Sequence, residues 1–458
     1  MGADLPNIMK LKVFRRAASW RGGRGEDDEP EWEDGMAERI FIVGHAAVTC
    51  LGSDMDSTWG GLIEGRSGIR RHAALGGESF LQDLAGLVED VGPGTAAEDP
   101  AIAKLSARFL HLAMAAARAA WADAGLDRRE AALDPHRAAV VMGSAFGGLD
   151  LLEAEQARMI KRRSPAISPY LIPAMLINQA AGQISQHLGL YGPSAAPANA
   201  CASGGHAVLL GAMFLRAGDA DVAVCGAAES AFTPPVVNGF ATMKALLGRR
   251  PGDRSEVDPA QASRPFSVDR AGFVMAEGAG ALILATETAV RRWGLEPQAE
   301  LLAWSSNSDG HHMAMPCRDR IAHCLRAALQ RSGLSPSAIH YYNAHGTSTA
   351  VNDQIETQVL KDVFGTAARR LPVSSIKGAL GHSLGAASAI EAAVAVRTLC
   401  TQLIPPTINY QPDPELDLDY VPDQARAARL DHVLTASFGF GGTNNALILR
   451  RTTSCHRP

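Results

Sequence analysis

The stretch ANACASGGHAVLLGAMFLRAGDADVAVCG, residues 198–226, carries the pattern that decides the fold. A turn of small residues leads into a helix of small and aliphatic residues over 202–216, which ends at Gly218 and Asp219. The apolar run 221–225 is short and uninterrupted, as in a strand that is buried on both faces. A helix that leads directly into a fully buried strand indicates an α/β fold.

The chain repeats this alternation from Arg39 onward. Short apolar runs predict buried strands, and longer runs with helical spacing predict helices. The predicted strands cover residues 40–43, 138–142, 280–286, 339–344, 373–376, 433–438 and 446–450, and the predicted helices cover 58–64, 106–124, 320–332 and 384–399. This order predicts βαβ units and largely parallel sheets. The pattern alone leaves open whether the chain is a duplication of two halves.

The composition is that of a globular protein, with 47% hydrophobic and 20% charged residues. A net charge of −5 argues against a nucleic-acid-binding protein with a dominant basic surface, although a local basic patch stays open. No apolar run reaches the roughly 18 residues of a membrane span. The length of 458 residues suggests about three domains. The 45 glycines and the low aromatic content of 5% indicate tight turns and a core of small aliphatic side chains.

The seven cysteines are scattered, odd in number and without a C-x-x-C pair. This arrangement argues against a disulfide framework and a cysteine-rich zinc site, and it fits a reducing compartment. Cys50, Cys225 and Cys400 are expected to be inert buried residues. Cys455 lies in the C-terminal tail.

Residues 1–38 differ from the rest of the chain. Six basic residues from Lys10 to Arg24 precede seven acidic residues from Glu26 to Asp34. No secretory apolar region follows the basic run, and the acidic block does not fit a transit peptide. We expect a disordered extension, or an upstream start codon with Met36 as the true first residue.

Cys201 lies between a turn of small residues and the predicted helix that follows it. The N-terminus of a helix favours a thiolate and would lower the pKa of this cysteine. The alanine and glycine neighbours leave room for a bulky substrate at the sulfur. These features favour a nucleophile over an inert buried cysteine, which is the more common fate of a thiol.

Two histidines and two phenylalanines follow other predicted strands, in turns of small residues. His345 leaves a strand into a Gly-Thr-Ser turn, and His382 opens an alanine-rich helix after Lys377. A helix N-terminus disfavours an imidazolium, so His382 is expected to be neutral and able to donate one N–H. Phe438 and Phe440, interleaved with glycines, suit a mobile aromatic gate beside backbone N–H donors. The alternatives are two structural histidines and a simple turn between core strands.

At these segments the chain resembles the β-ketoacyl-acyl-carrier-protein synthases, specifically the elongating Cys-His-His type of the thiolase-like superfamily. The resemblance extends from about residue 39 to residue 451, about nine-tenths of the chain. Each motif alone is weak, but together and in order they are specific. The matching segments are 143–148, 178–184, the Cys201 turn, 265–273, 277–280, 345–349, 381–382 and 439–444.

The resemblance implies a thiolase-like fold of two duplicated α/β halves in a five-layer αβαβα sandwich. The first half would cover 39–290 and carry the cysteine, and the second would cover 291–451 and carry both histidines. Residues 1–38 would be an extension and 452–458 a tail. The estimate of about three domains is therefore replaced by one duplicated unit, usually a homodimer in this family.

The resemblance also implies a reaction. Cys201 would take an acyl chain from an acyl carrier protein and hold it as a thioester. The backbone N–H groups of Cys201 and Phe440 would form the oxyanion hole. His345 and His382 would bind the thioester carbonyl of a malonyl-carrier protein and stabilise the enolate formed as CO2 leaves. The product would be a 3-oxoacyl thioester two carbons longer. Neither a metal nor an organic cofactor is expected.

Several further residues match family positions. Lys377 would orient the surroundings of the second histidine, with Glu391 and Asp269 in supporting positions. Phe146, Phe240, Phe438 and Phe440 would line or gate the acyl pocket. Phe146 stands where long-chain members often carry a smaller aliphatic residue, which suggests shorter or unusual primers, although it is equally consistent with ordinary core packing.

Other departures from the family pattern leave the three expected catalytic groups in place. They are Ser267 for an acidic residue, Ala350 for a proline and His311 for an aromatic residue. Together with Phe146 they slightly favour a specialised polyketide or modified-fatty-acid pathway over housekeeping fatty-acid elongation. The sequence does not decide between these pathways.

An acidic carrier protein would dock on a local basic rim. The candidate residues are Lys161, Arg162, Arg163, Arg249 and Arg250, and the alternative is an ordinary solvated surface. A cytoplasmic homodimer is expected, and a heterodimer with a related subunit stays open.

Three rival interpretations are weaker. A non-condensing chain-length-factor subunit shares the fold but typically lacks the cysteine. A cysteine hydrolase would leave one histidine, Lys377 and the Phe440 loop unexplained. A thiolase-type acyltransferase would need a second cysteine near the C-terminus, and Cys455 lies outside any such motif.

Overall fold

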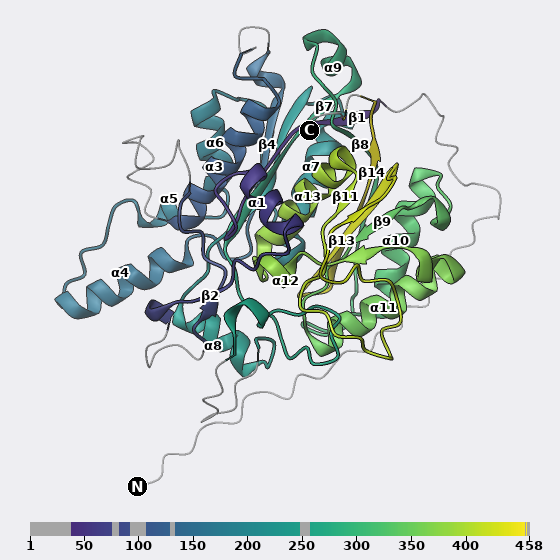
Figure 1. The fold of residues 1–458 in the computed structure, drawn as a ribbon. Helices are drawn as coiled ribbons and strands as arrows, with labels where there is room; N and C mark the ends of the chain where they lie inside the picture. Colours follow the sequence, from purple (N-terminus) through teal and green to yellow (C-terminus); the bar gives the residue numbers. More distant parts are fainter. Residues whose placement is uncertain are drawn as a thin grey trace, which may run out of the picture. The chain divides into compact units, whose positions relative to one another are not determined.

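The computed structural model describes residues 38–75, 82–91, 107–128, 133–247, 257–453 and 455. Its centre is a sheet of ten strands in the order β10-β9-β13-β14-β8-β1-β7-β6-β4-β5 (Figure 1). These strands are β1 (Ile40–Val48), β4 (Ala138–Gly143), β5 (Ser194–Ala195), β6 (Val222–Glu229), β7 (Gly278–Thr286), β8 (Ala299–Ser308), β9 (Tyr341–Asn343), β10 (Val373–Ser374), β13 (His432–Gly439) and β14 (Thr443–Arg451). Two ribbons lie apart from it, β2 (Arg70–Arg71) with β3 (Leu84–Ala85) and β11 (Leu403–Ile404) with β12 (Arg426–Ala427).

The sheet consists of two halves with the same topology. One half contains β1 and β4 to β7, and the other contains β8 to β10, β13 and β14. When the strands of each half are numbered along the chain, both halves read 3-2-4-5-1 from the outer edge to the junction. Within the sheet, the halves are joined where β1 pairs with β8, through Phe41 with Glu300 and Ile42 with Ala299. This identity of topology confirms the expected duplication.

The prediction of largely parallel sheets is wrong. In each half the three outer strands, β5, β4 and β6 or β10, β9 and β13, run parallel to one another. The next strand, β7 or β14, runs antiparallel to both of its neighbours. The error has a physical cause. These strands are buried on both faces and appear in the sequence as continuous apolar runs. Such a run does not indicate whether the neighbouring strands are parallel or antiparallel to it.

Helices cover both outer faces of the sheet halves and fill the space between them, which gives the expected five layers (Figure 1). Helices α3 and α6 pack on the first half, α7 and α13 lie between the halves, and α10 and α11 pack on the second half. Their bounds are α3 (Arg108–Asp123), α6 (Gln179–Leu188), α7 (Ser203–Arg216), α10 (Arg318–Ser332), α11 (Ala350–Phe364) and α13 (Ala387–Thr401). The shorter helices are α1 (Met55–Ile63), α4 (Leu149–Arg162), α5 (Leu171–Met175), α8 (Pro234–Thr242), α9 (Glu287–Trp293) and α12 (Lys377–Leu380).

Alternating side chains of each strand enter different layers. In β6, Val222 and Val224 belong to the core beneath α3, whereas Ala223 and Cys225 belong to the core around α7 and α13. The two central helices approach closely because the second residue of α7 is glycine. A Cβ atom on Gly204 would stand 2.4 Å from a backbone nitrogen of α13, so only glycine fits there.

Among the described residues, one helical run is long and apolar enough to cross a membrane, namely Leu384–Thr401. It is 83% buried inside the protein, as expected for the central helix of the sandwich. The expectations for residues 1–37 and for Arg249 and Arg250 fall outside the described residues.

Candidate active site

Cys201 lies in a one-turn helix that opens α7. Ala200, just before it, has a left-handed φ of 49°, which turns the chain sharply. The hydroxyl of Ser203 holds this turn, because it donates to the carbonyl of Ala200 at 2.7 Å and accepts from the N–H of Asn199 at 2.9 Å. The cysteine side chain is buried, with 9% of its surface exposed.

His345 follows β9, and buried charged groups fix its backbone. Its N–H and that of Gly346 donate to the Glu356 carboxylate, each at 2.8 Å. The carbonyl of His345 accepts from Nζ of Lys377 at 2.6 Å. The backbone of His345 is therefore fixed through both its N–H and its carbonyl, and this fixes the origin of the imidazole side chain.

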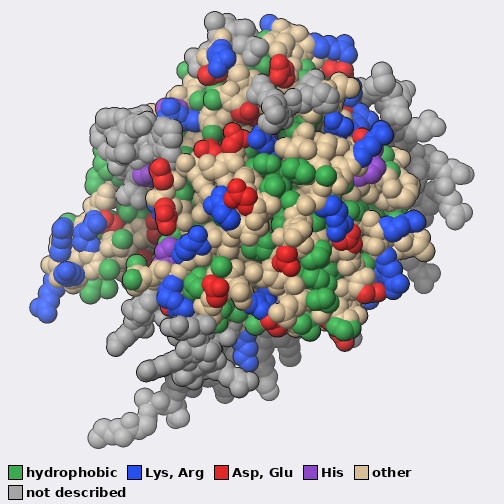
Figure 2. Space-filling view, in the orientation of Figure 1, with side chains coloured by type: hydrophobic (Ala, Val, Ile, Leu, Met, Phe, Trp, Pro, Cys, Tyr) green, Lys and Arg blue, Asp and Glu red, His purple; other side chains and the backbone are tan. Residues whose placement is uncertain are grey.

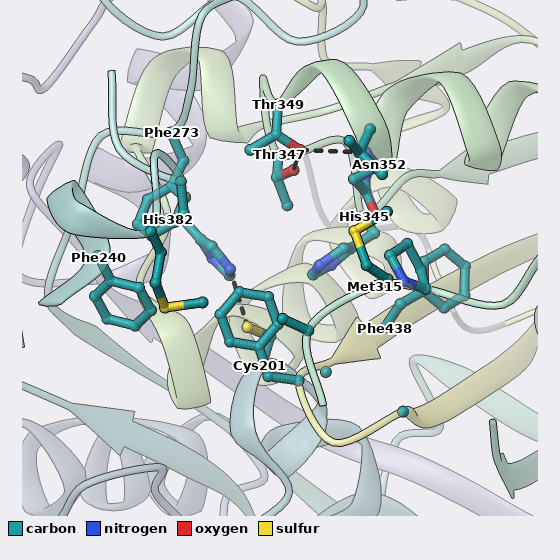
Figure 3. A pocket seen from close by; sticks show the side chains of 18 of the residues that line it. Cys201, Phe240, Phe273, Met315, His345, Thr347, Thr349, Asn352, His382 and Phe438 are labelled. Carbon is teal, nitrogen blue, oxygen red and sulfur yellow. Dashed lines mark hydrogen bonds between the residues drawn. The ribbon is translucent and has the colours of Figure 1, made fainter. Parts of the chain in front are cut away.

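His382 lies between α12 and α13 and is held by a parallel bridge. Its N–H donates to the carbonyl of Val274 at 2.7 Å, and its carbonyl accepts from the N–H of Ala276 at 3.0 Å. The Phe273 ring lies edge-on to the imidazole at 5.2 Å. Nε2 of His382 is 3.1 Å from Sγ of Cys201, and His345 points toward the same sulfur (Figure 3).

Burial sets the protonation of this cluster. It lowers the pKa of His345 and of His382 well below the usual value, and the Lys377 ammonium lowers both further, so both imidazoles are neutral, as predicted for His382. Burial raises the pKa of the Cys201 thiol to about 12. The prediction that the helix N-terminus lowers this pKa is wrong, because the loss of solvent outweighs the favourable helix end.

The tautomers of the two histidines are not fixed by hydrogen bonds. Nδ1 of His345 and Nδ1 of His382 are buried and have no hydrogen-bond partner within the described chain. Each ring can therefore present its other nitrogen either as an acceptor or as an N–H donor. The same histidine can therefore accept a proton in one step of a reaction and donate a hydrogen bond in another.

Lys377 and Glu391 form a buried ion pair next to the histidines. Ser437 donates to the second oxygen of Glu391 at 3.0 Å. The structure thus places Lys377 and Glu391 beside the cluster, as expected. Asp269 is different, because it pairs with Arg264 and with Ser267 and does not line the pocket.

A cavity of about 200 Å³ opens onto Cys201, His345 and His382. Phe240, Phe438 and Phe440 line it, as predicted. Phe146 does not line it but lies edge-on to Phe240, with 6.3 Å between ring centroids. The lining residues that the sequence interpretation did not single out include Met243, Phe273, His312, Met315, Thr347, Thr349 and Asn352.

The two amides expected to form an oxyanion hole are free. No hydrogen bond within the described chain uses the N–H of Cys201 or of Phe440. The loop that carries Phe440 passes close to the cysteine, since a Cβ on Gly439 would stand 3.3 Å from the Cys201 nitrogen.

Glu229 is a buried residue near the pocket that sequence reasoning missed. Its carboxylate accepts from the hydroxyl of Ser144 and from the N–H groups of Ala145, Phe146 and Gly385, at 2.6 to 3.3 Å. It thereby joins the Phe146 loop to the segment after His382. No local spacing reveals this, because the partners are backbone groups from distant parts of the chain.

Three of the predicted docking residues lie at the end of α4. Lys161 and Arg162 are in its last turn, and Arg163 caps it with a left-handed φ of 48°. All three are exposed, and Lys and Arg side chains gather at this end in Figure 2. Lys244, also exposed, adds a positive charge at the cavity mouth.

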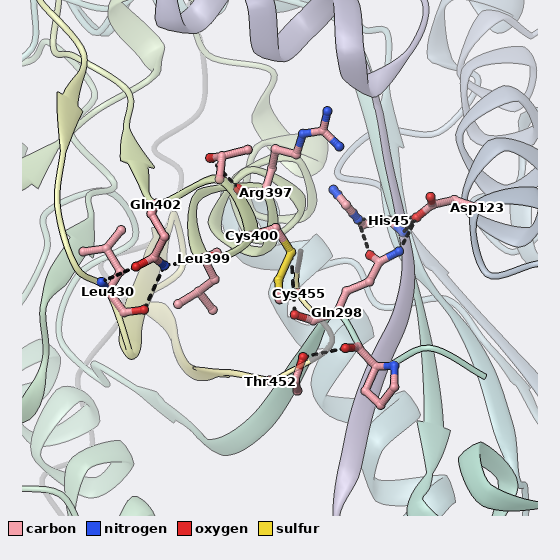
Figure 4. The surroundings of a disulfide bond; sticks show 12 residues. His45, Asp123, Gln298, Arg397, Leu399, Cys400, Gln402, Leu430, Thr452 and Cys455 are labelled. Atoms are coloured by element: carbon pink, nitrogen blue, oxygen red, sulfur yellow. Dashed lines mark hydrogen bonds and ion pairs between the residues drawn. A yellow bond between two sulfur atoms is a disulfide. The ribbon is translucent and has the colours of Figure 1, made fainter. Parts of the chain in front are cut away.

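A disulfide joins Cys400, in α13, to Cys455, after β14, with 4.8 Å between their Cα atoms (Figure 4). The argument against disulfides from scattered cysteines is wrong for this pair, and Cys400 is not the inert free thiol that was expected. Both sides of this disulfide lie beside the segment that precedes β8, because Sγ of Cys400 lies near the carbonyl oxygen of Gln298 and the hydroxyl of Thr452 donates to the carbonyl of Pro297. The other five cysteines are free.

Comparisons with solved structures place this arrangement in a class, that of the condensing enzymes with a thiolase-like fold. A β-ketoacyl synthase from Burkholderia phymatum superposes with a TM-score of 0.82 at 31% identity, covering 91% of this chain and 100% of that one. A type II polyketide ketosynthase solved in complex with its acyl-carrier protein has a TM-score of 0.81 at 30% identity, with the same coverage.

The sequence comparisons define the family. Residues 37–289 match the N-terminal domain of the β-ketoacyl synthases, and residues 298–411 match their C-terminal domain. Relatives named 3-oxoacyl-[acyl-carrier-protein] synthase 2 come from Synechocystis, at 38% identity, and Coxiella burnetii, at 35%, each covering 90% of this chain and 98% of the relative. The chain belongs to the β-ketoacyl synthase family. It is accordingly a condensing acyltransferase that forms 3-oxoacyl-carrier-protein thioesters, and the non-condensing alternative is not favoured.

Proposed function

We propose that Cys201 is the nucleophile of this condensing enzyme and that His345 and His382 bind the extender thioester. The observation that carries this proposal is the convergence of all three side chains in one cavity, with 3.1 Å between Sγ of Cys201 and Nε2 of His382. Each residue comes from a separate element, and each backbone is held independently.

In the first step, Cys201 attacks the carbonyl of an acyl-carrier-protein thioester. Its pKa of about 12 means that the resting group is a thiol, so the proton must leave as the new S–C bond forms. Nε2 of His382 accepts this proton and returns it to the departing thiol of the carrier. The free amides of Cys201 and Phe440 stabilise the oxyanion.

In the second step, a malonyl-carrier protein replaces the first carrier. Neutral His345 and His382 donate N–H hydrogen bonds to its thioester carbonyl, and CO2 leaves as the enolate forms. The enolate carbon attacks the acyl-Cys201 carbonyl, the S–C bond to the cysteine breaks, and the departing thiolate takes up one proton from solvent. Because a neutral imidazole can donate one N–H hydrogen bond whereas an ionised carboxylate can only accept, two buried neutral rings suit this task. Lys377 and Glu391 act as positioning residues through the carbonyl of His345.

Intact-mass spectrometry tests this assignment. Incubation with an acyl-carrier protein loaded with hexanoyl groups should add one acyl mass to the wild type and none to Cys201→Ala, whereas the control Cys317→Ser should be acylated. Later addition of malonyl-carrier protein should release a 3-oxoacyl product and restore the unmodified mass. Acylation of Cys201→Ala would refute the proposed nucleophile.

We also propose that the basic end of α4 docks the acyl-carrier protein. Lys161, Arg162 and Arg163 support this, because an acidic partner gains Coulomb attraction from clustered exposed cations. Arg162→Glu should raise the KM for carrier-bound substrate and leave the KM for small thioesters unchanged. The control Arg292→Glu reverses an exposed charge on α9, and it should change neither. Equal effects of Arg162→Glu on both substrates would contradict docking.

The primer is proposed to be shorter than that of long-chain members. The position of Phe146 behind Phe240 supports this, because a bulky second ring prevents Phe240 from swinging away from the cavity. Phe146→Ile should extend the range of accepted acyl lengths, measured with primers from C4 to C16 in steps of roughly two carbons. Unchanged chain-length selectivity in this series would refute the proposal. A polyketide pathway is consistent with this proposal but is not required by it.

We further propose a cytoplasmic homodimer in which residues 39–290 and 291–451 form the two halves of each subunit. Within the described chain, β5 is an edge strand with one unpaired side, and α6 contacts it. Exposed apolar residues lie on and around α5, which packs on α6, including Tyr170, Ile172 and Leu176. Ile172→Asp should yield monomers in analytical ultracentrifugation, whereas Met213→Asp, at another exposed apolar site, should not. A wild-type monomer, or a dimer that survives Ile172→Asp, would contradict this interface.

A further inference from the structure

The triad offers three ligand atoms of the type that transition metals bind. Sγ of Cys201 and ring nitrogens of His345 and His382 all lie within 4.8 Å of one another. In the part of the chain that the structure describes, this is the one group of three or more histidine, cysteine or acidic side chains so arranged. Figure 3 shows that both rings face the sulfur.

One thiolate and two imidazoles form a ligand set that suits zinc. Zinc binds sulfur at about 2.3 Å and imidazole nitrogen at about 2.0–2.1 Å, so tetrahedral geometry requires ligand atoms roughly 3.3–3.6 Å apart. The pair at 3.1 Å must open slightly, and the rest of the cluster must close by up to about 1.5 Å. Small ring rotations supply such shifts. A fourth position would remain open toward the cavity, where a water molecule fits.

The electrostatic environment does not oppose such an ion strongly. A neutral imidazole carries one unprotonated ring nitrogen, so each ring can offer a lone pair to the ion. The cysteine would lose its proton to solvent as the Zn–S bond forms, and the ion would then compensate the buried thiolate. The Lys377 ammonium repels a cation, but Glu391 is in contact with it and neutralises it.

The cavity mouth provides an entry path with further soft ligands. Met243 and Met315 line the cavity and are 52% and 45% exposed. His312 lines the same cavity. Thioether and imidazole groups bind late first-row metals weakly and would lead an ion from solvent toward the cysteine.

We propose that Cys201, His345 and His382 together bind one zinc ion reversibly, and that bound zinc and an acyl group on Cys201 exclude each other. The second clause rests on the function proposed above, whereas metal binding itself rests only on the cluster. Micromolar free zinc would therefore act as a reversible inhibitor of acyl transfer.

Cobalt(II) serves as a spectroscopic probe for this site. Metal-free wild-type protein titrated with CoCl2 should bind one equivalent and develop a thiolate-to-cobalt charge-transfer absorption, which ZnCl2 should displace. Cys201→Ala should lose the absorption, and His382→Ala should weaken binding at least about tenfold, as expected when a direct ligand is removed. The control Cys317→Ser removes a half-buried thiol outside the cluster, and it should behave as the wild type.

The outcomes separate the two proposals. If the wild type shows no thiolate–cobalt absorption, or if Cys201→Ala keeps it, the metal site is refuted while acylation of Cys201 can still be observed. If cobalt binds but Cys201 never becomes acylated, the metal site stands and the proposed function fails. Protein acylated at Cys201 should not develop the absorption, and full binding to acyl-enzyme would overturn mutual exclusion.

Discussion

The buried pair of Lys377 and Glu391 gives a quantitative prediction. Their side chains are 3% and 1% exposed, and Lys377 also donates to the carbonyl of His345. Lys377→Met removes the cation and leaves the carboxylate with one hydroxyl donor, Ser437. Removing one partner of a buried ion pair costs about 3–5 kcal/mol, and the unpaired carbonyl adds about 1 kcal/mol. We therefore expect Lys377→Met to lower the free energy of unfolding by about 4–6 kcal/mol.

A second variant separates charge from packing. In Lys377→Met/Glu391→Gln both charges are absent, so most of the penalty should disappear and the loss should be about 1–3 kcal/mol. Urea unfolding followed by tryptophan fluorescence measures both values. The reasoning is refuted if the single variant loses less than about 1 kcal/mol, or if the double variant is no more stable than the single one.

The same change has a separate effect on function. The Lys377 charge lowers the pKa of both histidines, so its removal should raise the pKa of each. The acidic limb of the pH profile for condensation should then move to higher pH in Lys377→Met. Loss of stability alone would not shift this limb, so an unchanged limb with reduced activity would indicate a merely structural role.

Three other perturbations have defined outcomes. Cys400→Ser opens a disulfide that spans 55 residues, and it should lower the free energy of unfolding by about 4 kcal/mol relative to the oxidised wild type in the chain-entropy view. The reduced wild type is the control, and it should be about as stable as the variant. Gly204→Ala should cost at least about 1–3 kcal/mol by overpacking, whereas Gly182→Ala, whose added methyl group meets nothing within 4 Å, should be neutral or stabilising in thermal unfolding. His345 and His382 bind protons in the unfolded chain but not in the folded one, so stability should fall as the pH drops below 6.5. The double Gln variant should flatten that part of the stability curve, and an unchanged slope would contradict the neutral rings.

The regular elements with simple patterns were predictable from the sequence. The helix and strand after Cys201 were found because small and aliphatic residues carry clear helix and strand signals. Helix α11 was missed because the first half of its buried face is polar. Asp353, Glu356 and Thr357 are fully buried there. The two carboxylates accept backbone N–H groups of the His345 loop, so the polar residues belong to the core for a reason that hydropathy does not show.

The candidate site was predictable only in part, for a similar reason. Cys201 was visible because it stands between a turn of small residues and a predicted helix, and His345 and His382 were visible because each follows a predicted strand in such a turn. Glu229 was not visible, since its partners are amides far away in the chain. The thiol pKa was misjudged because the helix N-terminus is a local feature, whereas burial depends on the whole fold.

The duplicated topology explains why the chemistry is divided between the halves. Cys201 precedes α7, and His382 precedes α13, and each of these helices connects the third strand of its half to the fourth. The two residues therefore occupy equivalent positions in the two halves, and the packing of α7 against α13 brings them together. His345 follows the second strand of its half, where the other half has the Ser144 loop held by Glu229. One half has a cysteine at this position and the other half has a histidine. Together they form a thiol and a proton acceptor, which neither half can supply alone. It follows that a fragment ending near residue 290 would keep the thiol and lose both imidazoles, so the junction between the halves, rather than either half, is the unit on which the activity depends.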